Sequence, residues 1–153
     1  MDNKVLLKFL IKAKQNTYAR GGEGGEKILA DGAKEFSFKE NLFYYRDRYY
    51  GYNPFAGQEV VFYQNKAIWV MNYYGKILSN IVSAKEIYNF LKTALLKIDH
   101  KKPFRGPSNL SNNNFKYKNK AQGNLEEFKG LEKIYYKKDL IYQLDYQGGL
   151  VKK

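Results

Sequence analysis

Apolar residues recur at helical spacing in two stretches of the chain. The first covers residues 3–15, where one apolar stripe runs along the segment and Asp2 or Asn3 caps its start. The second begins with the capping box Ser83–Glu86 and is expected to end near His100. Each stripe covers only one side of its helix, so the sequence predicts two helices that each bury one face.

Most of the remaining chain has the composition and alternation of β-strands. Three-residue loops separate several of these runs, which is typical of antiparallel hairpins. An asparagine-rich tract, residues 109–114, is expected to be a flexible loop. The strands are predicted at residues 35–38, 42–50, 59–63, 67–74, 115–118, 131–136 and 140–146.

Two of the predicted hairpins resemble each other without a gap at an offset of 73 residues. Residues 57–63 and 68–75 align with residues 130–136 and 141–148. Chance similarity between tyrosine-rich hairpins is the alternative, but we favour a duplicated helix-plus-strands unit. The identical pairs are Gly57 and Gly130, Glu59 and Glu132, Tyr63 and Tyr136, Ile68 and Ile141, Tyr73 and Tyr146, and Gly75 and Gly148.

The predicted fold is α+β, an antiparallel sheet from two pseudo-repeated helix-plus-strands units with two main helices packed on one sheet face. A length of 153 residues suits a single domain, whose halves we place at about residues 1–80 and 81–153. The other sheet face, or the groove between the halves, is then left for a ligand or partner.

The chain is strongly basic, with a formal net charge of +12. Such a charge is typical of proteins that bind nucleic acid or an anionic membrane surface. The lysines are spread along the chain rather than clustered, and a merely solvated basic surface explains the same composition. The charge alone therefore assigns no partner. The only arginines are Arg20, Arg46, Arg48 and Arg105.

Cysteine is absent, which excludes disulfides, thiolate catalysis and cysteine metal sites. No apolar run approaches the roughly 20 residues that span a bilayer, so no membrane partner is expected. Lysines interrupt the apolar stretch at the N-terminus, and we interpret that stretch as a helix of the mature protein rather than a signal peptide. The expected location is cytoplasmic.

Residues 44–52 form the segment richest in candidate site residues. In a strand, Arg46 and Arg48 share one face while Asp47 takes the other. Arginine suits carboxylate or phosphate and also stacks on aromatic rings, so the segment is a candidate for binding anions or bases. The alternative is an exposed strand whose arginines pack over tyrosines.

Two further groups of candidates lie in the repeated hairpins. Glu59 and Glu132 either face each other across the pseudo-axis and divide acid and base roles, or pair separately with basic side chains. Trp69, Tyr73 and Tyr146 have the alternation of a packed sheet face. They therefore form either the core or the wall of an aromatic pocket.

The loops offer fewer candidates. Arg105, in the proline-bounded loop 103–108, either holds an anion or braces the link from helix to sheet. The glycine-rich segment 21–25 lacks the lysine and hydroxyl residue of a phosphate-binding loop, and we expect a mobile loop there. With His100 as the only histidine, neither a zinc site nor a serine–histidine–acid set is expected. We assign no catalytic residue, no metal and no cofactor.

Six short motifs spread over nearly the whole chain are distinctive: TYA at 17–19, FYYRD at 43–47, GQEVV at 57–61, WVMNYYG at 69–75, RGP at 105–107 and YQGG at 146–149. Together they resemble a bacterial family named domain of unknown function 5680. That family occurs alone or fused behind an XRE-type helix-turn-helix, which implies a sensing or interaction domain and assigns no reaction. We find no helix-turn-helix pattern here, and Gln147 stands where the family pattern has histidine.

The sequence favours a non-catalytic binding or sensing domain that holds a small ligand or a protein partner in an aromatic groove. The alternative is a basic accessory or inhibitor protein that binds RNA or a nucleoprotein complex, for example from a mobile element. A third hypothesis is an uncharacterised enzyme. The oligomeric state stays open. The candidate binding residues are Arg46, Asp47, Arg48, Glu59, Trp69, Tyr73, Arg105 and Tyr146.

Overall fold

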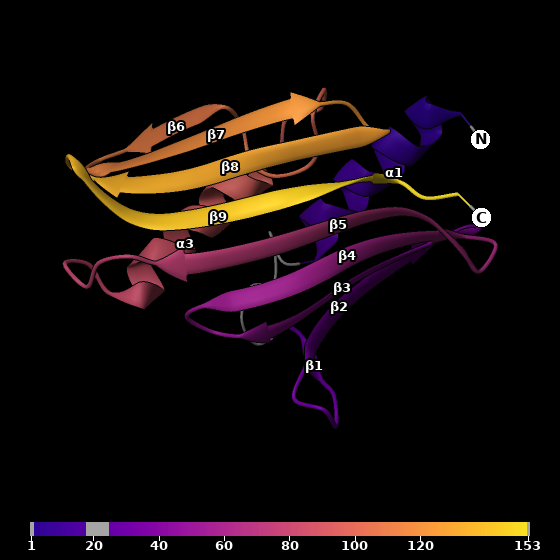
Figure 1. Cartoon of the computed structure of the whole chain (residues 1–153), viewed down its shortest axis with the longest axis horizontal. Helices are drawn as coiled ribbons and strands as arrows, with labels where there is room; N and C mark the ends of the chain where they lie inside the picture. The colour runs from indigo at the N-terminus through magenta and orange to yellow at the C-terminus, as the bar shows by residue number, and fades with distance from the viewer. Residues whose placement is uncertain (1, 18–24, 153) are drawn as a thin grey trace.

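The residues that the structure describes fold into a nine-stranded antiparallel sheet with two helices, which lie behind the sheet in Figure 1. The computed structural model describes residues 2–17 and 25–152, so most of the glycine-rich segment 21–25 lies outside the described residues. The helices are α1 (Asn3–Asn16) and α3 (Ala84–Leu96). The strands are β1 (Lys27–Ile28), β2 (Lys34–Glu40), β3 (Phe43–Gly51), β4 (Phe55–Tyr63), β5 (Lys66–Ile77), β6 (Asn109–Asn112), β7 (Phe115–Gly123), β8 (Glu127–Tyr136) and β9 (Asp139–Leu150).

Both helices begin where the capping signals predict. The Asp2 carboxylate accepts a hydrogen bond of 2.8 Å from the backbone N–H of Lys4, which satisfies a free donor of the first turn. At α3 the capping box is complete, because Ser83 and Glu86 each accept the other's backbone N–H at 3.3 Å.

The second helix ends at Leu96, earlier than the expected end near His100. The backbone N–H of Lys97 donates to the carbonyl of Ala94 at 3.1 Å, a bond over three residues instead of four. Such a bond tightens and closes the last turn. The apolar periodicity of the sequence therefore extends beyond the residues that are helical.

The order of strands across the sheet is β1-β2-β3-β4-β5-β9-β8-β7-β6. One meander runs from β1 to β5 and another from β6 to β9, and the two meet where β5 pairs with β9. At this junction Tyr73 lies directly opposite Tyr146. The predicted hairpins 35–50, 59–74 and 131–146 are confirmed as antiparallel pairs.

The prediction of a flexible loop at residues 109–114 was wrong. Asn109–Asn112 form β6, which pairs with β7 at the edge of the sheet. Asn113, in the turn between the two strands, has a φ of 51°. Asparagine tolerates this left-handed conformation better than most residues, so the asparagines build a tight hairpin turn.

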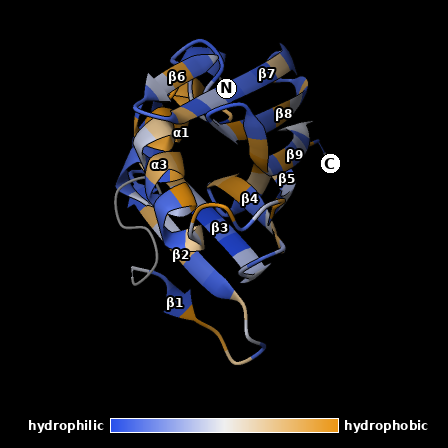
Figure 2. Cartoon of the chain, turned by 90° about the vertical axis from the view of Figure 1, so that its left-hand side faces the viewer, coloured by the Kyte–Doolittle hydropathy of each residue, from blue (hydrophilic) through white to orange (hydrophobic). Residues whose placement is uncertain are grey.

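The sheet curves around the helices, and both helices lie on its concave face (Figure 2). Alternate residues of each strand point into this concave side, as the burial of Phe43, Tyr45, Asp47 and Tyr49 along β3 shows. Apolar stripes of α1 and α3 close the core. The opposite sheet face is uncovered within the described residues. No helix in the described ranges is long and apolar enough to cross a membrane. The fully buried helix residues include Leu6, Leu10, Ile87 and Leu91.

Candidate functional site

Five charged side chains are buried on the concave side of the sheet, among the aromatic residues of the core. Lys14 comes from the last turn of α1 and Arg105 from the loop after α3. The three acids are Asp47 on β3, Glu59 on β4 and Glu132 on β8. Three carboxyl groups thus share two basic groups, and burial makes every unbalanced charge costly.

The Glu132 carboxylate is saturated by its neighbours. Arg105 donates to its two oxygens from Nε at 3.0 Å and Nη2 at 2.8 Å, a bidentate ion pair. The hydroxyls of Tyr117 and Tyr142 add hydrogen bonds of 2.6 and 3.0 Å. Burial lowers the pKa of Arg105, but attraction to Glu132 outweighs it and leaves that pKa well above the ordinary value. These four hydrogen bonds leave the Glu132 carboxylate without a free lone pair for a ligand.

Lys14 joins the end of α1 to the loop after α3. Its ammonium lies 2.5 Å from Glu59 Oε2 and donates to the carbonyl of Phe104 at 2.7 Å. Burial lowers the pKa of Lys14, and Glu59 partly opposes this effect. The hydroxyl of Tyr45 also hydrogen-bonds to Glu59. These contacts fix Glu59 in an ion pair of its own, apart from Glu132, so the facing pair of glutamates does not form.

Asp47 is the one buried acid of the described residues that makes no ion pair. It is 5% exposed and lies directly opposite Glu59 in the β3–β4 pair. Its Oδ1 accepts a hydrogen bond of 2.6 Å from the hydroxyl of Tyr73. Burial, followed by repulsion from Glu59, raises the pKa of Asp47 from 3.8 to about 7. This carboxyl therefore exchanges its proton near neutral pH.

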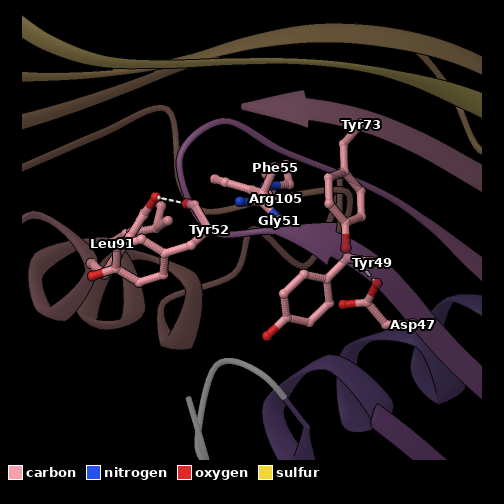
Figure 3. Close-up of a pocket in the computed structure, with 9 residues that line it drawn as sticks. Asp47, Tyr49, Gly51, Tyr52, Phe55, Tyr73, Leu91 and Arg105 are labelled. Atoms are coloured by element: carbon pink, nitrogen blue, oxygen red, sulfur yellow. Dashed lines mark hydrogen bonds between the residues drawn. The ribbon is translucent and has the colours of Figure 1, made fainter. Parts of the chain in front are cut away.

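Two small cavities adjoin Asp47, and both are also lined by Arg105. Each has a volume of about 30 Å³, enough for one or two water molecules. Figure 3 shows the first, in which the Tyr73 hydroxyl and the Asp47 carboxyl meet at one end and the Tyr52 turn lies at the other. Its remaining walls are Tyr49, Gly51, Phe55, Tyr88 and Leu91. The second is bounded by Lys14, Thr17, Tyr45, Glu59, Leu95, Ile98 and Phe104.

An equivalent arrangement on the other half of the sheet carries a neutral amide. Asn119 lies opposite Glu132 in the β7–β8 pair, as Asp47 lies opposite Glu59. Its Oδ1 accepts the hydroxyl of Tyr146 at 2.8 Å. The amide of Asn119, which does not ionise, thus accepts the same hydrogen bond from a tyrosine as the carboxyl of Asp47 does. The negative charge of Asp47 is therefore not required for that contact.

The structure brings four of the predicted site residues together on the concave side: Asp47, Glu59, Tyr73 and Arg105. Two others lie on the same side, but in the packed core. Trp69 is fully buried against Phe128 with ring centroids 5.5 Å apart, and Tyr146 is hydrogen-bonded to Asn119.

The two predicted arginines of β3 lie on the opposite, convex face. Arg48 makes an ion pair of 2.7 Å with Glu35, and the guanidinium of Arg46 lies 5.3 Å from the ring centroid of Phe62. Both are therefore separated from Asp47 by the sheet. The alternation of the strand predicts this separation, and the structure agrees.

Lys14 and Asn119 are members of the buried cluster that the sequence analysis missed. Lys14 stands four residues after Leu10, on the apolar stripe of α1. This position in the sequence indicates that the lysine is buried. Asn119 gave no such signal. Among the described residues no group of three or more histidine, cysteine, aspartate or glutamate side chains could hold a metal ion.

Comparison with known proteins yields one family. A family model described as "Domain of unknown function (DUF5680)" matches residues 47–151, which begin at Asp47 and include β4 to β9. No curated protein and no protein of solved structure matches the chain.

Proposed function

Because the chain belongs to the DUF5680 family, whose description assigns no activity, we propose from the site itself that the domain binds a small molecule between its helices and its sheet. The ligand is a protonated amine with an apolar body, and it is bound without being chemically changed. The observation that carries this proposal is the Asp47 carboxyl, buried at the end of an aromatic cavity and raised in pKa to about 7.

The charges of the cluster favour a cationic ligand. Asp47 and Glu59 lie opposite each other, while Lys14 is the cation that contacts Glu59. A protonated amine beside Asp47 would balance the second carboxylate. Such a ligand would also replace the proton that Asp47 otherwise holds near neutral pH.

The walls of the cavity suit the same ligand. Tyr49, Tyr52, Phe55, Tyr73 and Tyr88 line it. Aromatic faces attract cations and bury apolar groups, as in binding sites for ammonium ligands. A ligand larger than a few atoms enters by displacing the turn at Tyr52, which is 43% exposed.

Binding explains this site better than catalysis does. Glu132 and Arg105 neutralise each other, Lys14 is held by Glu59, and the chain has no cysteine. The carboxyl that faces Asp47, that of Glu59, is held in its ion pair with Lys14, so no second group is free to exchange a proton with a substrate. An acid–base reaction needs such a partner, whereas the capture of a cation does not.

The two meanders support the finer architecture that the sequence suggests, and we infer that they are copies of one unit. Tyr73 and Tyr146, equivalent in the alignment at an offset of 73 residues, face each other across the β5–β9 junction. Register irregularities fall at the equivalent bonds Val61/Phe62 and Ile134/Tyr135. Asp47 and Asn119 are then counterparts, and one copy has kept or gained an acid where the other needs only an amide.

Thermal denaturation with matched ligands tests the proposed function. At pH 8, 2-phenylethylamine is expected to raise the melting temperature of the protein, by roughly 5 °C or more when its concentration is about 100-fold above its Kd. The neutral isostere 2-phenylethanol should have little effect. Asp47→Asn should abolish the shift, and Tyr146→Phe, which changes the second copy, should retain it. Equal shifts with amine and alcohol, an unchanged shift in Asp47→Asn, or no shift with this amine or a panel of larger aromatic amines would overturn the proposal.

A further inference from the structure

The convex face of the sheet, which is turned to the viewer in Figure 1, carries a concentration of lysines on the second meander. Alternation places every second residue of β7 and β8 on this face, and many of those residues are lysine. The neighbouring β5 adds another. Although the lysines are dispersed along the sequence, the fold gathers six of them on one surface. They are Lys76, Lys116, Lys118, Lys120, Lys129 and Lys133.

The register of the strands sets like charges against each other. Lys118 lies directly opposite Lys133 in the β7–β8 pair, and the same row continues through Gln143 on β9 to Lys76 on β5. Like charges opposite each other destabilise a sheet. None of these lysines has an ion pair within the described residues. Their charge is therefore available to an anionic partner, which would also relieve the repulsion.

Acidic side chains are few on this part of the face. Asp145 of β9 lies beside the row, with Gln143 donating to it at 3.4 Å, and Glu127 stands at the start of β8. Two acids do not balance six lysines, so the surface keeps a positive potential. Such a potential attracts and orients a polyanion.

The same face is hollowed. Two open grooves of about 620 and 480 Å³ lie over it, and they adjoin each other because both are lined by Lys120 and Leu131. We call the two grooves together the channel. Tyr74 lines one part of this channel and Tyr135 the other. Tyr74 is 51% exposed, and the ammonium of Lys118 lies 5.8 Å from the ring centroid of Tyr135.

We propose that this channel binds single-stranded nucleic acid. Lysines along a groove follow a phosphate backbone, and the exposed ring of Tyr74 offers a face on which an unpaired base stacks. A folded acidic protein would use the lysines but not a channel with aromatic rings. The channel is separate from the proposed amine site, because the sheet lies between it and Asp47.

Fluorescence anisotropy of labelled 12-mers of uridine and of deoxythymidine, at about 50 mM salt, tests this inference. We expect both oligonucleotides to bind, and the ratio of their Kd values shows whether RNA or DNA is preferred. A 12-base-pair duplex should bind more weakly than either. Lys118→Gln/Lys133→Gln should weaken binding at least about tenfold. It should also reduce the slope of log K against log salt by about 1.4, because each phosphate that a lysine neutralises adds about 0.7 to that slope.

A matched control separates the channel from the general charge of the protein. Lys8→Gln/Lys85→Gln removes the same charge from exposed positions on the two helices, on the other side of the sheet. This double variant should change binding less than twofold.

A further variant tests the stacking component without changing the charge. Tyr74→Ala should weaken binding several-fold while leaving the salt slope unchanged. Asp47→Asn should bind the oligonucleotides as the wild type does, which separates this result from that of the amine experiment. No binding at low salt, equal or tighter binding of duplex, or equal weakening in the two lysine double variants would overturn the inference.

Discussion

Asp47 and Glu59 lie directly opposite each other on β3 and β4, both buried, and Lys14 makes an ion pair with Glu59 but not with Asp47. Burial and the neighbouring carboxylate together raise the pKa of Asp47 to about 7. Two adjacent buried carboxylates cannot both ionise cheaply, so Asp47 keeps a proton at a pH where exposed acids have released theirs. This relationship makes the concave side of the sheet sensitive to pH.

The stability of the protein should therefore fall as pH rises from about 4 to about 7. In this range the folded Asp47 still binds a proton that the unfolded chain has released, because its pKa rises from 3.8 to about 7 on folding. The native state thus binds more protons, and the free energy of unfolding decreases with pH. The full decrease is on the order of 4 kcal/mol for this rise in pKa. Urea denaturation at half-unit steps from pH 4 to pH 9 measures it.

Asp47→Asn isolates this contribution from those of the other ionisable groups. The amide accepts the Tyr73 hydroxyl but cannot ionise, so the variant should equal the wild type near pH 4 and exceed it in stability at pH 8. A constant difference between the two proteins at every pH would show that Asp47 does not titrate in this window.

Local patterns in the sequence predict much of this site. Alternation along β3 places Asp47 on the side away from Arg46 and Arg48, and the capping box fixes the start of α3. Lys14 continues the apolar stripe of α1 and was overlooked because a lysine near the end of a helix is usually solvated. Its burial depends on Glu59, which approaches it only in the folded chain.

The pairing of strands could not be predicted from the same patterns. At an offset of 73 residues Asp47 aligns with Lys120, whereas the residue that faces Glu132 as Asp47 faces Glu59 is Asn119. The turn after β7 has one more residue between paired positions than the turn after β3. The residue opposite Glu132 therefore lies one position earlier in the sequence than the offset of 73 predicts. A shift of one residue moves a side chain to the other face, so only the observed register identifies the acid–amide pair.

Breaking the buried Arg105–Glu132 ion pair should strongly destabilise the protein. Arg105→Met leaves the Glu132 carboxylate, 0% exposed, with only tyrosine donors, and should reduce the free energy of unfolding by about 3–5 kcal/mol. Arg48→Met is the control, because the Arg48–Glu35 pair on the convex face is partly exposed and should contribute much less to stability. Urea denaturation at pH 7 compares them, and similar decreases in both variants would contradict the assignment.

The two tyrosine hydroxyls at the β5–β9 junction should differ in their effect on pH dependence. Tyr73→Phe removes a hydrogen bond that lowers the pKa of Asp47, so that pKa should rise further. Tyr146→Phe removes the matching bond to Asn119, which does not ionise. Carboxyl carbon NMR titration of Asp47 measures the effect. An equal change of the Asp47 pKa in both variants would show that the two tyrosine hydroxyls do not act separately.

Replacing the glycines beneath these tyrosines by alanine tests the site through a change of packing, without a change of charge. Gly57 lies opposite Tyr73 and Gly130 opposite Tyr146, and an added Cβ at either glycine would overlap the tyrosine ring. Each substitution should cost about 1–3 kcal/mol of stability, the usual range for overpacking.

Only Gly57→Ala should also weaken amine binding, because Tyr73 lines the cavity beside Asp47, whereas neither Gly130 nor Tyr146 does. Thermal denaturation with and without 2-phenylethylamine measures both effects in one experiment. If Gly130→Ala weakened binding as much as Gly57→Ala did at equal stability, the ligand would lie elsewhere than beside Asp47. Weakening confined to Gly57→Ala would place the ligand there by a substitution that leaves every charged residue of the cluster unchanged.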